Sequence, residues 1–243
     1  MQAVEYHNLA ALERTHWWHV GMAALAVDWL RRLPHEPGGR ILDAGCGTGG
    51  AMQWLAEFGR VCGLDWHPLA VQLAGRYNHR QLVRADIGAV PFAAGSFSML
   101  TAFDVLYHHA VGDDAAALRE CARVLRPGGW LLVRVPAGDW LRGAHDAAVH
   151  TRHRYSRQEL RRKLTAAGFQ PVRITYANAA LLVPAVVWRL WQRHQAAASD
   201  VRQVARPVNW LLIWLLRLEQ LWLRRFNLPV GLSVLALARK PVQ

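Results

Sequence analysis

The chain has 243 residues, of which 53% are hydrophobic and 19% are charged, and this composition excludes both a disordered chain and a small scaffold held together by disulfides or metal ions. Its 29 basic residues against 17 acidic ones give a formal net charge of +12, and all but two of the bases are arginines. Positive charge of this size suits nucleic acid or an anionic surface, but it identifies neither as the partner.

Apolar residues at helical spacing predict an N-terminal helical segment over residues 9–33, which ends at Pro34. From residue 40 the pattern changes to short apolar runs that are separated by stretches with helical spacing. These runs predict five strands, at 40–47, 61–66, 81–87, 96–106 and 130–137. The first strand leads into a glycine turn, and the last follows a predicted helix over 113–129.

Two further strands complete the pattern. A helix begins at Ser156, whose hydroxyl caps it while Glu159 completes a capping box, and it ends before Gly168. Strands are then expected at 170–177 and 231–240. Because alternating strands and helices need crossover connections, the order predicts an α/β protein with a doubly wound, Rossmann-like, seven-stranded and mostly parallel sheet that carries helices on both faces.

The segment after the first predicted strand is rich in glycine, which lets a ligand approach the backbone closely. Gly45, Gly47 and Gly50 satisfy the G-x-G-x-x-G fingerprint of dinucleotide-binding proteins, and Asp65 follows at the distance expected of a ribose-binding acid. The charge of Asp43 distinguishes between two candidate ligands, because its carboxylate would repel the pyrophosphate of a dinucleotide but attract the sulfonium and ammonium of S-adenosylmethionine. The charge pattern therefore favours the cationic ligand.

The run Asp43-Ala44-Gly45-Cys46-Gly47-Thr48-Gly49 resembles motif I of the class I S-adenosylmethionine-dependent methyltransferases, in particular the UbiE/UbiG-like, type 11 group. Residues 123–133 are similar to the helix, turn and strand that precede strand five in that family. The resemblance extends over about residues 40–176 and implies S-adenosylmethionine as cofactor, with S-adenosylhomocysteine as product. It assigns cofactor contacts to Asp43, Ala44, Gly45, Cys46, Gly47, Gly49, Asp65, Trp66, Asp86, Ile87, Phe103 and Asp104.

The resemblance also implies individual roles in holding the cofactor. Asp65 matches the acid that binds both ribose hydroxyls, and Trp66 is placed to stack on adenine. Asp86 and Ile87 match the pair that reads the adenine edge. The residues themselves leave plainer alternatives open, with Asp65 as a helix N-cap, Asp86 as a turn acid and Asp104 as the cap of a following helix.

The stretch Tyr107-His108-His109 follows the fourth predicted strand, on the side where the methyl group would lie. A histidine can accept a proton near neutral pH, so His108 and His109 are the candidate catalytic bases. The family often has glutamate where Tyr107 stands, and the histidine that matches His108 is also commonly a structural or pocket-lining residue. Methyl transfer is an in-line displacement, so positioning alone supplies much of the catalysis and no base is obligatory.

The segment His16-Trp17-Trp18 resembles a signature of a bacterial subgroup of these enzymes found with lipid, glycan and natural-product genes, in which it covers the cofactor. His19 and Val20 replace the aromatic residue and arginine that commonly follow. A second stretch of the subgroup is matched by His145, Asp146, Arg152, Arg154 and Tyr155, with Thr151 in place of a further histidine. The resemblance assigns substrate contacts to Trp17, Trp18, Tyr107, His145, Arg154 and Tyr155, whereas the plainer alternative places the arginines in a solvated loop.

Residues 178–229 form an insert longer than two adjacent strands need for their connection. The chain thus divides into an N-terminal helical cap (1–39), a domain that binds S-adenosylmethionine (40–177 and 230–243) and this insert. The insert contains five tryptophans, which are Trp188, Trp191, Trp210, Trp214 and Trp222. Three interpretations of its apolar helical face stay open: packing on the sheet domain, an acceptor lid or membrane-interface helix over 208–226, and a homodimer contact.

The cysteines and the N-terminal residues bear on the compartment. Cys46, Cys62 and Cys121 are odd in number and fit neither a disulfide framework nor a zinc site, so we expect a reducing cytoplasm and no metal ion, with Cys46 as a small turn filler. The N-terminus lacks a continuous apolar stretch, and no window reaches the roughly 18 uncharged apolar residues of a spanning helix. The sequence therefore predicts a cytoplasmic protein, with peripheral contact to the inner membrane face as an option.

The leading hypothesis is a methyltransferase that modifies oxygen or carbon of a small, hydrophobic or lipid-linked acceptor, as in natural-product, lipid or glycan biosynthesis. An RNA methyltransferase would suit the positive charge, but the sequence has no clustered basic stripe, so nucleic acid is not the expected partner. Asp43 disfavours a nicotinamide oxidoreductase. A non-catalytic cofactor-binding or membrane-associated scaffold is the alternative from another class.

Overall fold

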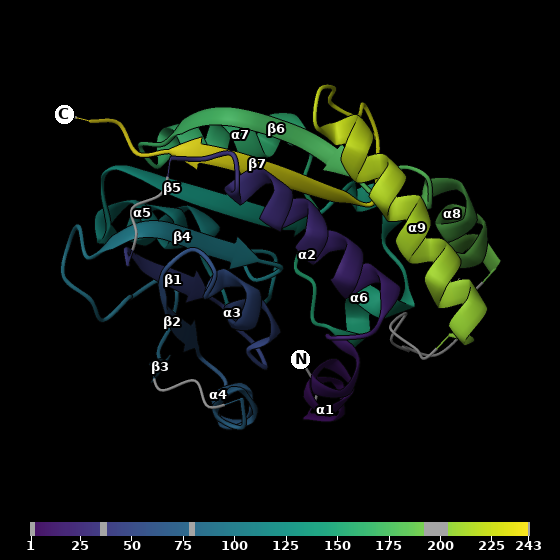
Figure 1. Ribbon diagram of the computed structural model, residues 1–243, viewed down its shortest axis with the longest axis horizontal. Coiled ribbons are helices and arrows are strands. Elements are labelled where there is room, and N and C mark those ends of the chain that lie inside the picture. The colour runs from purple at the N-terminus through teal and green to yellow at the C-terminus, as the bar shows by residue number, and fades with distance from the viewer. Residues whose placement is uncertain (1–2, 35–37, 78–80, 192–203, 243) are drawn as a thin grey trace.

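The computed structural model describes residues 3–34, 38–77, 81–191 and 204–242, and within them seven strands form one mixed sheet in the order β3-β2-β1-β4-β5-β7-β6 (Figure 1). Neighbouring strands from β3 to β5 are parallel, whereas β7 runs antiparallel to both β5 and β6. The predicted seven-stranded, mostly parallel α/β fold is therefore confirmed. The strands are β1 (Arg40–Ala44), β2 (Arg60–Asp65), β3 (Leu82–Arg84), β4 (Phe97–Phe103), β5 (Leu125–Pro136), β6 (Gln170–Ala177) and β7 (Ser233–Arg239).

Helices cover both faces of the sheet, as predicted. One face carries α2 (Trp17–Leu30), α3 (Gly50–Leu55) and α9 (Arg206–Leu223), and the other carries α5 (Asp114–Val124) and α7 (Arg157–Ala166) (Figure 1). Because side chains alternate along a strand, Ile41 of β1 joins the buried cluster that includes α2, and the next residue, Leu42, joins the cluster on the side of α5. The remaining described helices are α1 (Ala3–Leu12), α4 (Pro68–Gly75), α6 (Ala144–Ala148), α8 (Leu182–Trp191) and a 3₁₀ turn at Asp139–Leu141.

The N-terminal segment is helical, as predicted, but it begins at Ala3 rather than at residue 9. It forms two helices, α1 and α2, with a turn at residues 13–16 between them. His16 has an extended backbone, and its Nδ1 accepts a hydrogen bond from the amide of Trp18 at 3.4 Å, so it caps α2. No glycine or proline marks this turn, and an unusual cap of this kind is hard to recognise from spacing alone.

The boundary between α5 and β5 also differs from the prediction. Helix α5 ends at Val124 rather than at 129, and β5 begins at Leu125 rather than at 130. Leu125 pairs with Phe97 and Trp130 pairs with Met99. The proline and glycine residues between Leu125 and Trp130 therefore form a bulge in the pairing of β5 with β4. The turn residues therefore interrupt the strand without ending it.

The insert predicted at 178–229 contributes α8 and α9, and residues 192–203 lie outside the described part of the chain. Helix α9 packs against α2 at Gly21, where a Cβ atom would lie only 2.2 Å from Cδ1 of Leu216. The absence of a side chain at Gly21 therefore lets the two helices approach closely. Among the helices described, none is both long enough and apolar enough to span a bilayer.

Candidate active site

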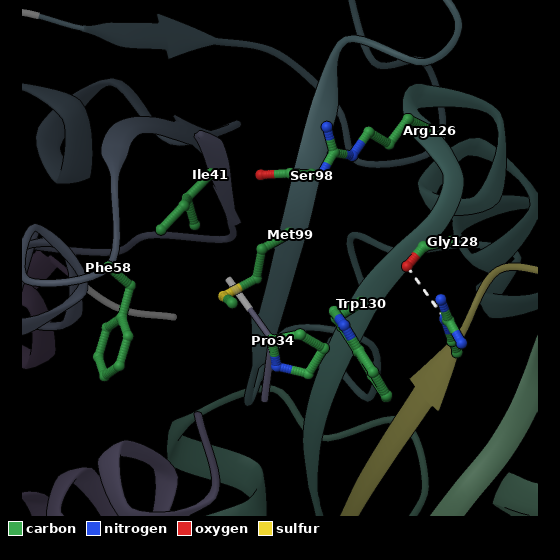
Figure 2. Close-up of a pocket in the computed structure, with 9 residues that line it drawn as sticks. Pro34, Ile41, Phe58, Ser98, Met99, Arg126, Gly128 and Trp130 are labelled. Atoms are coloured by element: carbon green, nitrogen blue, oxygen red, sulfur yellow. Dashed lines mark hydrogen bonds between the residues drawn. The ribbon is translucent and has the colours of Figure 1, made fainter. Parts of the chain in front are cut away.

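A cavity of about 1270 Å³ opens at the carboxyl ends of the parallel strands. The ends of β1, β2, β4 and β5 form its floor, and residues of α1, α2, α6 and α8 form its walls. A second cavity, of about 180 Å³, lies at the opposite edge of the sheet between Ile41, Met99 and Trp130 (Figure 2). Ligands of doubly wound sheets bind at the carboxyl edge, so the larger cavity is the candidate site.

The glycine turn after β1 is shaped by close approach to its neighbours. Gly45 has a φ of +80°, and a Cβ atom there would lie 2.6 Å from Cβ of Val105, so this position requires glycine. The amides of Gly45 and Cys46 both donate to the carbonyl of Leu64, at 2.7 and 2.9 Å. The turn is thereby fixed against β2, with its backbone at the cavity.

Asp43 is the most unusual charge in the cavity, with only 1% of its surface exposed. Its Oδ1 accepts a hydrogen bond from the hydroxyl of Thr101 at 2.7 Å, whereas its Oδ2 is buried without a hydrogen-bond partner. Burial raises the pKa of this carboxyl from 3.8 to about 7, and the hydrogen bond from Thr101 opposes that shift. A cationic group in the cavity would satisfy the free oxygen.

Asp65 ends β2 and is also buried at the cavity wall. Its Oδ2 accepts from the amide of Gly47 at 3.0 Å and its Oδ1 from the amide of His67 at 2.9 Å, while burial raises the pKa of the carboxyl. The alternative that Asp65 caps helix α4 is wrong, because His67 is the N-cap and its Nδ1 accepts from the amide of Leu69. Asp65 instead fastens the glycine turn to β2.

The remaining predicted cofactor residues fall into two groups. Trp66, Asp86 and Ile87 line the cavity, and Asp86 also accepts from the amide of Gly88 at 2.7 Å, so it is a turn acid as well. Cys46, Gly47, Phe103 and Asp104 line the cavity too. Ala44 and Gly49 do not reach the cavity wall, because Ala44 is buried at the end of β1 and Gly49 is the N-cap of α3.

Asp104 pairs with an arginine that the sequence analysis did not single out. Arg134, on β5, donates from Nε to the Asp104 carboxylate at 2.7 Å. Its guanidinium also lies 4.6 Å from the ring centroid of Trp18 and 5.0 Å from that of Phe103. The alternative that Asp104 caps a following helix is wrong, because the next helix, α5, begins at Asp114 and is capped by Asp113. A lone arginine inside the apolar run 130–137 was the signal that could have indicated this cluster.

The N-terminal segment is attached to the glycine turn by a second residue that was missed. Oε2 of Glu13 accepts from the hydroxyl of Thr48 at 2.7 Å and from the amide of Gly50, the first residue of α3, at 3.1 Å. A carboxylate at a helix N-terminus is favourable. Tyr6 of α1 is buried and stacks on His67, with the ring centroids 4.5 Å apart. Residues 3–16 therefore cover the end of the cavity that contains Asp65.

The two predicted catalytic histidines lie in different places. His108 is half-buried and lines the cavity, as does Tyr107, whereas His109 is exposed and does not. Burial lowers the pKa of His108 to about 4, so its imidazole is neutral near pH 7. His19 also lines the cavity, and its Nε2 is buried without a hydrogen-bond partner. Burial lowers the pKa of His19 to about 3.

The predicted substrate residues are likewise dispersed. Trp17 and Trp18 line the cavity, and so does Arg154, but Nε and Nη2 of the Arg154 guanidinium donate to the two carboxylate oxygens of Asp146, at 2.8 and 3.1 Å. Arg154 is buried, which contradicts the alternative of a solvated loop for this residue. His145 lies in α6, and its side chain is outside what the structure describes.

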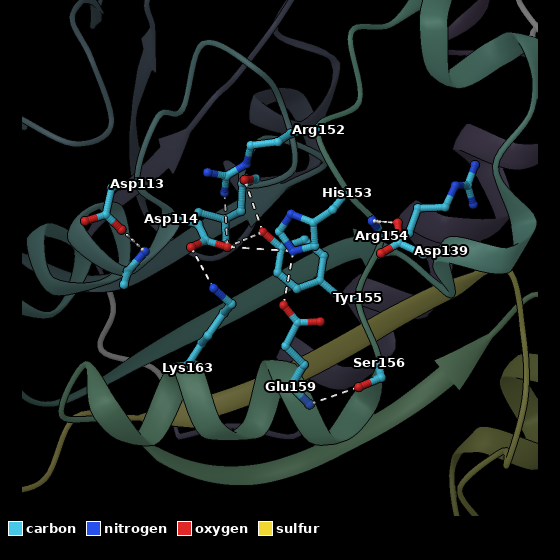
Figure 3. A network of polar contacts seen from close by, with 12 residues as sticks. Asp113, Asp114, Asp139, Arg152, His153, Arg154, Tyr155, Ser156, Glu159 and Lys163 are labelled. Atoms are coloured by element: carbon cyan, nitrogen blue, oxygen red, sulfur yellow. Dashed lines mark hydrogen bonds and ion pairs between the residues drawn. The ribbon is translucent and has the colours of Figure 1, made fainter.

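Tyr155 lies away from the cavity wall, in a polar network behind it (Figure 3). Its hydroxyl donates to the Asp114 carboxylate at 2.6 Å, and Nζ of Lys163 donates to the same group at 2.8 Å. Burial opposes ionisation of Asp114, but the hydrogen bonds from Lys163 and Tyr155 hold its pKa below the ordinary value. The network connects α5, α7 and the loop before α7, so its visible role is structural.

Comparison with known proteins finds methyltransferases that are similar to part of this chain. Residues 42–133 match the family model of the methyltransferase domain. A Mycolicibacterium smegmatis protein named "probable S-adenosylmethionine-dependent methyltransferase" is 34% identical over 146 residues, which cover 58% of this chain and 56% of that protein. A demethylmenaquinone methyltransferase of Corynebacterium kroppenstedtii is 39% identical over 104 residues, which cover 42% of this chain and 44% of the relative. The chain thus spans about half the length of the curated relatives that it matches.

A solved structure extends the likeness to almost the whole chain. A methyltransferase of Haloferax volcanii, determined in complex with the Trm112 methyltransferase activator, aligns with a TM-score of 0.63 over 98% of both chains at 22% identity. At this identity the similarity shows a common fold, in which the N-terminal helices and the insert also have counterparts.

Proposed function

We propose that the whole chain transfers a methyl group to a small hydrophobic or lipid-linked acceptor. The premise is that residues 42–133 are a class I S-adenosylmethionine-dependent methyltransferase domain related to the UbiE/UbiG type. Oxygen or carbon is the expected methylated atom. The assignment of the His-Trp-Trp segment to a subgroup belongs to the same proposal.

The observation that carries the proposal is the unpartnered buried Oδ2 of Asp43 at the cavity. An anionic oxygen in this position fits a cationic ligand, and the neighbouring Asp65 adds a second carboxylate at hydrogen-bonding range of the glycine turn. Asp43 and the glycine turn would hold the methionine part, Asp65 the ribose, and Trp66 with Asp86 the adenine. When bound, S-adenosylmethionine supplies a methyl group on a positively charged sulfur.

The acceptor side of the cavity is mainly apolar. Its wall includes Trp17, Trp18, Val149, Leu181, Pro184 and Leu212. Arg134 and Arg154 also reach it, but each is paired with a carboxylate, so neither offers a free charge to an anionic acceptor. An uncharged, apolar acceptor therefore fits best, and a relative named for demethylmenaquinone methylation supports this class.

The residues of this chain would assist transfer by positioning and by proton acceptance. The apolar wall excludes water and orients the acceptor, which supplies much of the catalysis in an in-line displacement. His108 is the first candidate base, but its Nδ1 accepts a hydrogen bond from the amide of Ala110 at 3.1 Å, so this bond would have to open before the neutral ring could take a proton from the acceptor. His19 is a second candidate, because its buried Nε2 has no other partner.

The test is methyl transfer from tritium-labelled S-adenosylmethionine to three kinds of acceptor, namely prenylated phenols and quinols, water-soluble catechols and bulk tRNA. We expect label in the organic phase with the prenylated acceptors, and its loss in Asp65→Ala. Calorimetry with S-adenosylhomocysteine and with NAD gives an independent measure of the cofactor. Label in tRNA alone, or tighter binding of NAD, would contradict the proposal.

A further inference from the structure

The outer face of α9 exposes a row of large apolar side chains. Five of them, each between 44% and 68% exposed, lie within four turns of one helix, and they are Trp210, Trp214, Leu218, Leu221 and Trp222. The first four are spaced by four, four and three residues, and Trp222 lies four residues after Leu218, so all five lie on one side of the helix. An apolar row of this size on a surface marks an interaction site rather than random exposure.

The inner face of α9 is already occupied by contacts with the rest of the molecule. Leu216 and Leu223 are buried, and Leu216 packs on Gly21 of α2. The side chain of Asn209 accepts from the amide of Trp17 at 2.8 Å and donates to the carbonyl of Thr15 at 2.9 Å. The orientation of α9 is therefore fixed, and its tryptophans face outward because the opposite side is held.

Helix α8 also exposes apolar side chains and contributes to the cavity wall. Val183 and Val187, one turn apart, are both exposed on α8. Pro184 and Ala185 of the same helix line the cavity, and so does Leu212 of α9. In Figure 1 both helices lie at the same end of the molecule. The exposed apolar surface and the wall of the acceptor cavity therefore share the same two helices.

The charge around this surface is positive. Arg217 and Arg225 are exposed on α9 and just after it, and Arg224 is exposed while it pairs with Asp28. The only acidic residue between 204 and 242 is Glu219. Its carboxylate points inward and accepts from the amides of Asn178 and Ala179 at 2.6 and 2.8 Å. Among residues 204–242, the outward surface thus combines tryptophan with arginine, and no carboxylate faces outward.

We infer that the outer surface of α8 and α9 docks on a bilayer that contains anionic phospholipid. Tryptophan is favoured at the boundary between headgroups and acyl chains, and exposed arginines add attraction to anionic headgroups. Docking through these helices would turn the adjoining cavity wall toward the lipid. This inference rests on the proposed function, because it explains how an acceptor that is scarcely soluble in water would reach the cavity.

The experiment is flotation of the full chain with vesicles of phosphatidylcholine alone and of phosphatidylcholine with phosphatidylglycerol. We expect binding to the anionic vesicles, weakened by high salt, and at least tenfold weaker binding of the pair Trp210→Glu and Trp214→Glu. The pair Arg217→Glu and Arg225→Glu should lose the preference for anionic lipid. Trp140→Glu is the matched control, because Trp140 is 66% exposed but lies outside α8 and α9.

Each variant is also titrated with S-adenosylhomocysteine without vesicles, which shows that it is folded and keeps failure of the cofactor assignment separate from failure of docking. Equal flotation of wild type and the Trp210/Trp214 pair would overturn the inference. So would light scattering that shows a wild-type dimer, lost in this pair, together with no binding to either vesicle. In that case the surface joins two copies of the chain.

Discussion

Replacement of Asp43 by asparagine tests the electrostatic basis of the site. The Asp43 carboxyl is 1% exposed, and burial, opposed by the hydrogen bond from Thr101, raises its pKa from 3.8 to about 7. A carboxyl whose pKa is raised on folding favours the folded state below its unfolded pKa, and this contribution is lost as pH rises through the folded value. Above pH 7 the buried charge therefore destabilises the ligand-free protein.

The size of this effect follows from the two pKa values. A difference of about three, at about 1.36 kcal/mol for each, corresponds to about 4 kcal/mol of lost stability at high pH. Between pH 5 and pH 9 the wild type should lose about 2 to 3 kcal/mol from this residue alone. Asp43→Asn carries no titrating group, so it should lack that part of the pH dependence.

Urea unfolding of both proteins at pH 5, 7 and 9 measures the difference directly. The diagnostic quantity is how the difference in free energy of unfolding between wild type and Asp43→Asn changes with pH, because any fixed cost of the buried amide is the same at each pH. Asp86→Asn is the control, since it removes an equal charge from an exposed position on the same cavity. Parallel curves for wild type and Asp43→Asn over this range would refute the reasoning.

The same ionisation should couple to ligand binding. S-adenosylhomocysteine carries an ammonium group, which favours the ionised form of Asp43, so its affinity for the wild type should rise as pH increases from 6 to 8. Asp43→Asn should bind more weakly and lose this pH dependence. Calorimetry in buffers with different ionisation enthalpies would show proton release on binding to the wild type below pH 7 and none in the variant.

Three further changes test the other contacts. Asp65→Ala should weaken S-adenosylhomocysteine binding at least tenfold, or about 1.4 kcal/mol by calorimetry, and unchanged affinity would count against the ribose assignment. Glu13→Ala removes the acceptor of the Thr48 and Gly50 hydrogen bonds, so it should lower the free energy of urea unfolding by about 1–3 kcal/mol. It should also speed proteolysis near residue 13, with Glu5→Ala as the control. Tyr155→Phe should destabilise the fold by a similar amount, about 1–3 kcal/mol, without changing cofactor affinity; a selective loss of affinity would instead place Tyr155 in the site.

The arrangement of strands was predictable because it depends on local periodicity. All seven strands lie where apolar runs between turn residues indicate them, and the alternation with helices requires parallel crossovers. The errors lie at boundaries that depend on tertiary contacts. β5 starts early because Leu125 finds a partner in Phe97 across the sheet, and that pairing outweighs the turn signal of the residues that follow.

That most of the proposed cofactor residues would line one cavity was predictable for a related reason, since short motifs at strand ends converge once the strands are parallel. The missed residues, Glu13 and Arg134, act on partners far away in sequence. Glu13 contacts Thr48, and Arg134 contacts Asp104 and Trp18. A lone arginine in an apolar run marks Arg134, but no local pattern indicates its partners, because Asp104 follows the neighbouring strand β4 and Trp18 belongs to the N-terminal segment. Arg154 was noticed for its charge, but its partner, Asp146, lies on a helix whose position only the fold determines.

Helix α2 links the two ends of the proposed mechanism. Trp18 near its start stacks on Arg134 beside the cofactor half of the cavity, while the amide of Trp17 donates to Asn209 of α9. At its other end, Asp28 pairs with Arg224 of α9 at 2.8 Å. Polar contacts therefore join α2 to α9 at both ends of α2. If the outer surface rests on a bilayer, the lipid-facing helix and the Trp17-Trp18 wall would be held as one unit, so an acceptor leaving the lipid would meet a wall already in place.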